Sequence, residues 1–179
     1  MELLKDELPP GFTIVCTDES FFTYDSMVRK VWVEEHSRPT VTVTGSHEHS
    51  CLFGALSLDG RQLFRQYDTF NGKAFYDYLK QVHRKFPRCI LFLDKASEHQ
   101  TEEVLSYFER HERTLVPIWE PRASPEFMPL EECWNISKDD LLVLRYYSSF
   151  PNFKEKIGEY FRTKRFHLNI ANYLLTEPR

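Results

Sequence analysis

Short apolar runs separated by polar or turn-forming residues dominate the first two-thirds of the chain. Residues 89–93 form a continuous apolar run of the kind that is buried on both faces of a sheet. The runs 51–58 and 62–67 flank Asp59-Gly60, a two-residue turn signal, and so predict a β-hairpin. The same reasoning predicts strands over 12–17 and 114–119, and a weaker strand over 27–34.

Apolar residues recur at helical spacing in the later segments. Asn71 is suited to a helix N-cap and Pro87 stops a helix, so the apolar positions between them predict a helix over 71–85. The same periodicity predicts helices over 101–111, from Leu130 onward, and over 152–174. Strands followed by alternating helices and strands are typical of an α/β domain. We therefore expect a mixed sheet with antiparallel and parallel strands, flanked by helices.

Composition narrows the class of protein. The 179 residues fit one domain, and an apolar fraction of 41% with 15% aromatics excludes a disordered chain. There are six glycines and no GxGxxG or GxxxxGK[ST], which argues against a nucleotide-binding Gly loop. The four cysteines form no CxxC pair, so we expect neither a zinc ribbon nor a disulfide framework. No signal peptide and no membrane-length apolar run are present, and we expect a cytoplasmic protein.

Charge is distributed unevenly along the chain. The net charge is −4, from 23 basic and 27 acidic residues, so this is not a basic domain that coats DNA. Residues 1–144 carry 16 basic and 24 acidic side chains, whereas residues 145–179 carry seven and three. An acidic body with a basic end is compatible with metal binding in the body and phosphate contact near the end.

Two aspartates follow apolar strands and are candidate metal ligands. Asp18 ends the run 12–17 and Asp94 ends the run 89–93, and the ends of parallel strands form a common crevice. Two neighbouring carboxylates repel each other unless a cation neutralises them, and oxygen ligands favour Mg²⁺ or Mn²⁺. A third carboxylate would complete the site, and the candidates are Glu126, Glu131 and Glu132. Helical geometry after Pro129 slightly favours Glu131.

Five segments together resemble a known family. They are CTDESFF (16–22), LFGALSLDG (52–60), LFLDKASEH (91–99), VPIWEP (116–121) and SPEFMPLEECWN (124–135). Their order and spacing resemble the catalytic domain of Tc/mariner-type transposases, and most of all the bacterial and archaeal insertion-sequence branch. Two family asparagines are replaced, by Lys95 and by Met128. Met128 would occupy the N-cap of the glutamate helix, where it cannot cap.

The resemblance implies a fold, an activity and a cofactor. It implies a ribonuclease-H-like α/β domain over 1–179 with a mixed five-stranded sheet. This would be the DDE catalytic domain of a transposase. In it Asp18, Asp94 and Glu131 would hold two Mg²⁺ or Mn²⁺ ions for DNA strand cleavage and strand transfer.

The resemblance also implies partners and a place in the cell. The partners would be transposon-end and target DNA. Family members carry a helix-turn-helix module ahead of this domain, which we expect to be missing here or separately encoded. A homodimer is compatible with the family, and the expected location is the prokaryotic cytoplasm, with the nucleoid.

Several basic or polar residues are candidate DNA contacts: Lys95, His99, Arg162, Lys164 and Arg165. His99 matches the family's histidine, and it could equally bond backbone at a helix entry. A rival function is an inactive or domesticated domain that serves as a DNA- or protein-binding module. The intact carboxylates argue against this rival, whereas Lys95 and Met128 argue weakly for it. A ribonuclease or junction nuclease on the same fold is a third alternative.

Overall fold

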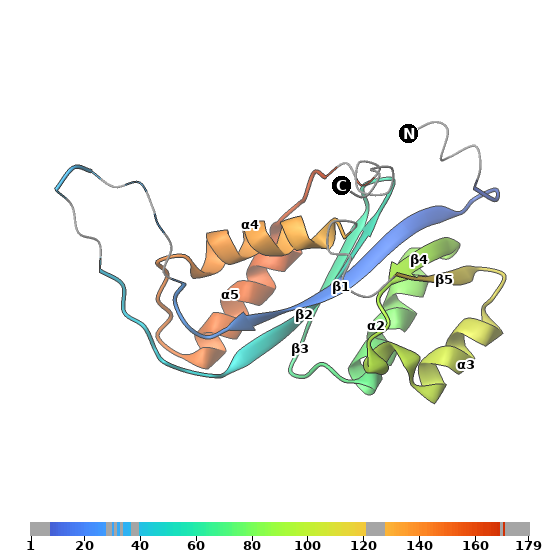
Figure 1. The fold of residues 1–179 in the computed structure, drawn as a ribbon, viewed down its shortest axis with the longest axis horizontal. Coiled ribbons are helices and arrows are strands. Elements are labelled where there is room, and N and C mark those ends of the chain that lie inside the picture. Colours follow the sequence, from blue (N-terminus) through green and yellow to red (C-terminus); the bar gives the residue numbers. More distant parts are fainter. Residues whose placement is uncertain are drawn as a thin grey trace.

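The computed structural model describes residues 8–27, 30, 32, 34–36, 40–120, 128–168 and 170. Five strands make one sheet: β1 (Thr13–Thr23), β2 (His49–Ser57), β3 (Gln62–Tyr67), β4 (Cys89–Leu93) and β5 (Leu115–Trp119). Their order is β3-β2-β1-β4-β5 (Figure 1). The pairs β1–β2 and β2–β3 are antiparallel, and the pairs β1–β4 and β4–β5 are parallel. The predicted mixed five-stranded sheet is confirmed.

Helices cover both faces of this sheet. They are α2 (Gly72–Lys85), the short 3₁₀ helix η1 (Ser97–Gln100), α3 (Glu102–Arg110), α4 (Leu130–Leu142) and α5 (Phe150–Thr163). Figure 1 shows α2 and α3 on one side of the strands and α4 and α5 on the other. The described chain is thus a three-layer α/β structure.

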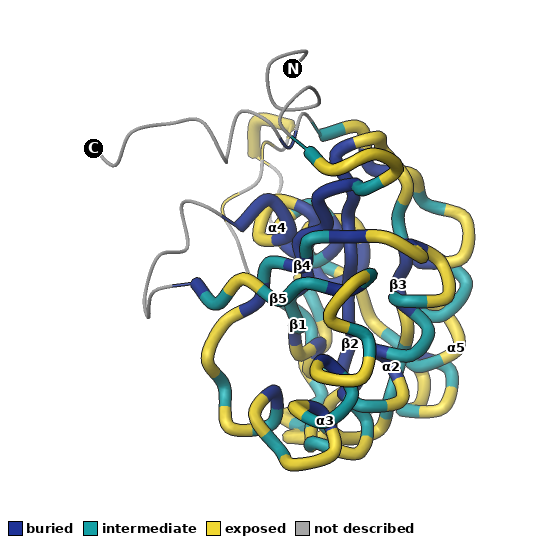
Figure 2. Tube along the Cα trace, turned by 90° about the vertical axis from the view of Figure 1, so that its right-hand side faces the viewer, coloured by how far each residue is buried: buried dark blue, intermediate teal, exposed yellow. Residues whose placement is uncertain are grey.

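Two apolar cores fill the spaces between the layers. Successive residues of a strand point to opposite faces, so Val15 joins the core under α2 and α3 while Cys16 joins the core under α4 and α5. The buried stretches of the central strands are visible in Figure 2. All four cysteines are buried and free, as small apolar side chains of these cores. No described helix is long and apolar enough to cross a bilayer.

Local signals in the sequence positioned most elements correctly. The hairpin turns at Asp59-Gly60, and Gly60 has the positive φ of 83° that a turn of this kind uses. The Asn71 side chain caps α2 by accepting a hydrogen bond from the Ala74 backbone N–H at 2.9 Å. The strand over 89–93 and the helix from Leu130 also lie where the pattern predicts.

The first strand is longer than predicted. The run 12–17 was expected to end at Asp18, but β1 continues to Thr23 and its second half pairs with β2 through Thr23↔His49. The partner strand compensates for the polar residues, because backbone hydrogen bonds to β2 continue along them. Asp18 therefore lies in the middle of a strand, opposite Gly54 of β2.

Three other expectations differ from the structure. The described residues of 27–34 form no strand, and Met27 makes only an isolated bridge to Val143. The last helix begins at the Ser149 N-cap and ends at Thr163, not at residue 174. Met128 is not an N-cap: Pro129 holds that position, while Met128 is 6% exposed and packs in the core beside α4. An apolar residue is favourable at position 128, so methionine there does not remove a helix cap.

Candidate active site

Asp18 and Asp94 come from the two central parallel strands. The register of β1 and β4 runs from Thr13↔Cys89 to Cys16↔Phe92, and the same offset carried two residues further matches Asp18 with Asp94. β4 ends at Leu93, so beyond that point the β4 side of β1 is no longer covered by a strand. Register matches the two residues, but Asp18 does not end its strand, and the two side chains have different partners, Trp134 for Asp18 and His99 for Asp94. That the two carboxylates share one metal site stays a prediction.

Asp18 is a carboxylate in an apolar setting. The Trp134 indole N–H of α4 donates a hydrogen bond of 2.8 Å to Asp18 Oδ2. Burial is the largest influence on the pKa of Asp18, and the negative charge of Glu19 adds to it. These effects outweigh the Trp134 hydrogen bond and raise the pKa to about 7. The negative charge of Asp94 contributes in the same direction.

Asp94 lies in a different environment, with its side chain 56% exposed. Its Oδ1 accepts a hydrogen bond of 3.0 Å from the Ala96 backbone N–H and lies 2.7 Å from His99 Nδ1. The hydrogen bond from His99 is the largest influence on Asp94 and lowers its pKa. Asp94 is therefore ionised at neutral pH, while its neighbour Asp18 resists ionisation.

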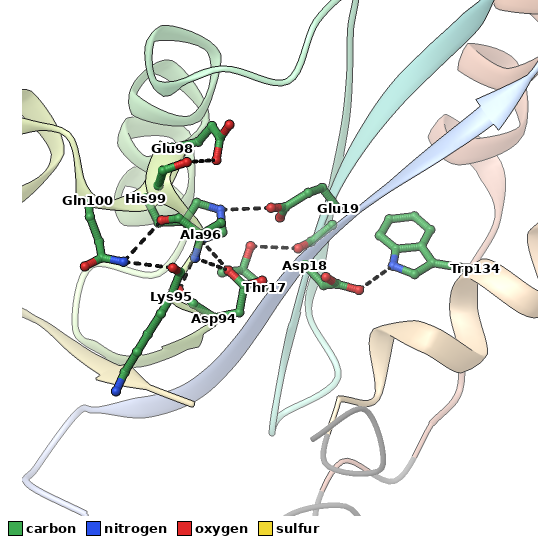
Figure 3. Close-up of polar contacts among 12 residues, drawn as sticks. Thr17, Asp18, Glu19, Asp94, Lys95, Ala96, Glu98, His99, Gln100 and Trp134 are labelled. Atoms are coloured by element: carbon green, nitrogen blue, oxygen red, sulfur yellow. Dashed lines mark hydrogen bonds and ion pairs between the residues drawn. The ribbon is translucent and has the colours of Figure 1, made fainter. Parts of the chain in front are cut away.

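His99 lies between two carboxylates, as Figure 3 shows. The ring is 1% exposed, and Nε2 is 2.9 Å from Glu19 Oε1 while Nδ1 faces Asp94. The Nε2–Oε1 contact is an ion pair whose angle is too bent for a hydrogen bond. Burial is the largest influence on His99 and lowers its pKa, but Asp94 and Glu19 together raise it to about 10. His99 is thus an imidazolium at neutral pH.

Glu19 was not singled out by the sequence, although it directly follows Asp18. Because neighbours on a strand point to opposite faces, Glu19 turns toward η1 while Asp18 turns toward α4 (Figure 3). Ligand atoms of Glu19, Asp94 and His99 lie within 4.8 Å of one another, which suits a metal by distance. Both ring nitrogens already face carboxylates, however, so the imidazolium offers no lone pair to a metal.

Glu120 is a further carboxylate that sequence reasoning missed. It follows β5, is 8% exposed, and its backbone N–H donates to the Leu93 carbonyl at 2.9 Å. Burial first, and then the charge of Asp94, raises its pKa. The signal was present in the sequence, because Glu120 directly follows a parallel strand as Asp94 does.

Gly54 fixes how closely α4 approaches the sheet. A Cβ at Gly54 would lie 2.5 Å from Leu130 Cδ2 and 2.7 Å from the Trp134 ring. The missing side chain therefore lets α4 pack directly on β2 and bring Trp134 to Asp18. Glu131 lies in the first turn of this helix and is exposed. Glu126 lies outside the described residues.

The candidate DNA contacts are distributed over different environments. Lys95 is exposed and extends away from the carboxylates (Figure 3), and it forms no ion pair with Asp94. His99 is buried, so it cannot reach the backbone of a bound duplex. Lys164 is held by Asp140 at 2.8 Å.

Arg162 and Arg165 lie together beside the hairpin. They line a cavity of about 420 Å³ with Arg61, Arg65 and Lys85, over a floor that includes Phe64 and Phe161. None of the described residues that line it is acidic. This basic groove lies on the β3 edge of the sheet, away from Asp18 and Asp94.

A comparison with models of protein families identifies the family of this chain. The model of the DDE superfamily endonucleases matches residues 13–154. A search of curated proteins returned no match.

The chain also resembles solved transposase structures. The Mos1 strand transfer complex is 19% identical with a TM-score of 0.62, over 84% of this chain and 47% of that one. The Mos1 mariner paired-end complex with Mn is 21% identical with a TM-score of 0.59, over 84% and 48%. The catalytic domain of Mos1 mariner transposase is 18% identical with a TM-score of 0.56, over 84% and 70%. The fold is therefore ribonuclease-H-like, and the chain spans about half the length of the Mos1 chains in the DNA complexes.

Proposed function

The chain belongs to the DDE superfamily of endonucleases, and from this premise we propose that it is the catalytic domain of a transposase. The proposed activity is metal-dependent cleavage of DNA strands and transfer of the freed ends. The register of β1 and β4 supports this proposal, because carried two residues past its last pair it matches Asp18 with Asp94, just after β4. Asp18 is also half-buried, and burial together with the negative charges of Glu19 and Asp94 raises its pKa, as is common for carboxylates at functional sites.

A divalent cation fits this donor set. Burial and negative neighbours raise the pKa of Asp18, and a bound cation removes that penalty because it favours the ionised form. All proposed ligand atoms are carboxylate oxygens, which Mg²⁺ and Mn²⁺ prefer. We assign Asp18, Asp94 and Glu131 to hold two such ions. When bound, the ions would activate a water or a 3′-hydroxyl and stabilise the leaving oxygen.

Glu131 is the third ligand in this proposal because of its place on α4. Residues three apart on a helix are neighbours on the surface, so Glu131 lies one turn before Trp134, whose indole reaches Asp18. Helical side chains also lean toward the N-terminus, which brings the Trp134 ring over that first turn. Glu132 is turned by a further 100° around the helix.

The side chains around the ligands supply orientation. Trp134 donates to one oxygen of Asp18, and the Ala96 backbone N–H donates to one oxygen of Asp94. Each aspartate thus accepts a hydrogen bond from a neutral donor, and Asp94 is in addition paired with His99. Without a cation, the same carboxylates would repel a phosphodiester, so productive DNA approach depends on neutralising them.

We propose that the DNA backbone also contacts the basic groove. Arg65, Lys85, Arg162 and Arg165 form no ion pair with any described residue, and guanidinium groups bind phosphate through paired N–H donors. Because the net charge is −4, a local basic surface would favour association with DNA. Lys164 and His99 are left out of this contact set, because one is ion-paired and the other is buried.

Nicking of supercoiled plasmid DNA in the presence of Mn²⁺ tests the proposed function. Glu131→Gln should abolish nicking while the circular dichroism spectrum stays that of wild type, because only a ligand is lost. Glu132→Gln is the matched control and should keep most of the activity. Nicking that survives Glu131→Gln and disappears with Glu132→Gln would place the wrong glutamate in the site. No Mn²⁺-dependent nicking by the wild-type chain would favour the non-catalytic alternative.

A further inference from the structure

We propose that His99 is a positioning residue for Asp94, and that Glu19 holds the His99 ring in place from behind. The inference rests on the proposed function, because it concerns how one metal ligand of that site is oriented. It assigns a role to two residues that lie behind the site. One is the buried His99 of η1, and the other is Glu19, which is mostly buried and lies on the opposite face of β1 from Asp18.

The two carboxylate oxygens of Asp94 differ in their contacts. Oδ1 receives the Ala96 N–H at 3.0 Å and lies 2.7 Å from His99 Nδ1. Nδ1 also lies 3.2 Å from the Asp94 backbone carbonyl, so the ring touches both ends of the residue. No described residue contacts Oδ2 by a hydrogen bond or ion pair. A carboxylate fixed through one oxygen presents the other in a defined direction, as a metal ligand requires.

The ring itself is held on all sides. It packs against Phe75 with ring centroids 4.0 Å apart and against the edge of Phe70 at 5.8 Å. Glu19 closes the remaining side, with Oε1 2.9 Å from Nε2 and its side chain 10% exposed. An ionised glutamate is rarely buried without a cation, so Glu19 and the His99 imidazolium stabilise each other in this setting.

A packing role alone does not explain this arrangement. An apolar side chain would fill the space beside Phe75 without burying two charges, and burial of Glu19 would then be unnecessary. A direct metal role for His99 does not fit either, because both ring nitrogens face carboxylates. The chain Glu19–His99–Asp94 is instead continuous from the protein interior to an exposed carboxylate, which suits orientation of that carboxylate.

Two near-isosteric substitutions of His99 distinguish its contact with Asp94 from its contact with Glu19. The amide nitrogen of asparagine lies where histidine carries Nδ1, and that of glutamine lies where histidine carries Nε2. His99→Asn therefore keeps a donor toward Asp94, whereas His99→Gln keeps a donor toward Glu19 and loses the one toward Asp94. Both variants remove the positive charge and the ring. Asparagine is one methylene shorter than glutamine and leaves the larger gap, so a role in packing alone would make His99→Asn the more damaging variant.

The primary measurement is Mn²⁺ affinity from the electron paramagnetic resonance of free Mn²⁺, with unfolding free energies measured in urea beside it. His99→Gln should weaken Mn²⁺ binding roughly tenfold or more, in the range that loss of an outer hydrogen bond to a ligand produces. His99→Asn should stay within about threefold of wild type. Glu19→Gln, whose amide keeps an oxygen beside Nε2, should also stay within about threefold.

Equal weakening by His99→Asn and His99→Gln, or no weakening by either, would overturn the inference. Weakening by Glu19→Gln as large as that by His99→Gln would also overturn it, because Glu19 would then act as a ligand itself. The proposed function can fail independently of this inference. If the wild-type chain and its variants bind Mn²⁺ in the expected order of affinity but the wild-type chain never nicks DNA, the positioning role stands and the nuclease activity is refuted. A chain that nicks DNA while both His99 variants bind Mn²⁺ alike would lose only the positioning role.

Discussion

Asp18→Asn should stabilise the metal-free chain at alkaline pH, although it removes a proposed catalytic group. In the folded chain the pKa of Asp18 is raised from 3.8 to about 7, with burial as the main cause. An acid with a raised folded-state pKa contributes stability that is full below its unfolded pKa and is lost as the pH rises through the folded pKa. Asparagine cannot ionise, and its amide oxygen can still accept the hydrogen bond from Trp134.

The size of the effect follows from the shift. A rise in the pKa of Asp18 from 3.8 to about 7 lowers the unfolding free energy by about 4 kcal/mol once the pH exceeds the folded-state pKa, at about 1.36 kcal/mol per pKa unit. Between pH 5 and pH 8 wild type should lose roughly 2–3 kcal/mol relative to the variant, because part of the penalty is already present at pH 5. Added Mg²⁺ should raise the stability of wild type at pH 8 and leave Asp18→Asn nearly unchanged.

Urea unfolding from pH 4 to pH 8.5, with and without EDTA, measures this difference directly. The difference between wild type and variant is the informative quantity, because other groups titrate in both proteins. Asp140→Asn is a control of opposite sign. Hydrogen bonds from Lys164 and Tyr160 lower the pKa of Asp140, so removing that carboxylate should destabilise the chain once the pH exceeds the unfolded pKa.

A stability difference between wild type and Asp18→Asn that does not change with pH would refute the reasoning. So would a variant less stable than wild type at pH 8 in EDTA. Either result would mean that Asp18 is well solvated or already neutralised in the folded chain, and the argument for a cation from the cost of its charge would no longer hold.

Two further predictions concern packing and DNA. Gly54→Ala should lower the unfolding free energy by about 1–3 kcal/mol, because the new Cβ meets Leu130 of α4. Gly158→Ala, in the middle of α5, is the control and should be near neutral. Urea unfolding measures both variants, and equal effects would contradict the tight α4 contact. Joint replacement of Arg65 and Arg162 by glutamine should weaken duplex DNA binding and flatten its dependence on log salt by roughly 0.9 per lost phosphate contact, measured by fluorescence anisotropy. Lys156→Gln removes a cation already paired with Glu159 and should change neither the affinity for duplex DNA nor its salt dependence. A similar loss of affinity with Lys156→Gln would argue against a specific role of the groove.

The sequence by itself determined the elements and the family. Strand β4, the hairpin turn at Asp59-Gly60 and the Asn71 cap of α2 depend on interactions within a few residues, so local pattern was sufficient for them. Asp94 was also correctly placed, because the end of a short buried run is a local property. Five motifs in order were enough for the family, and the ribonuclease-H-like fold followed from it.

The tertiary structure alone decided where charges meet. Asp18 was expected at a strand end, but pairing with β2 carries β1 on to Thr23, and this pairing depends on residues 26 to 36 positions away along the chain, from Thr23↔His49 to Asp18↔Gly54. The partnership of Glu19 with His99, 80 residues apart in the sequence, arises because alternate residues of β1 face opposite layers. The position of Glu120 after a strand could be read from the sequence, but its burial could not, because neighbours from other elements set it. Charge compensation across a sheet is a long-range balance of burial against pairing, and no local pattern in the sequence records it.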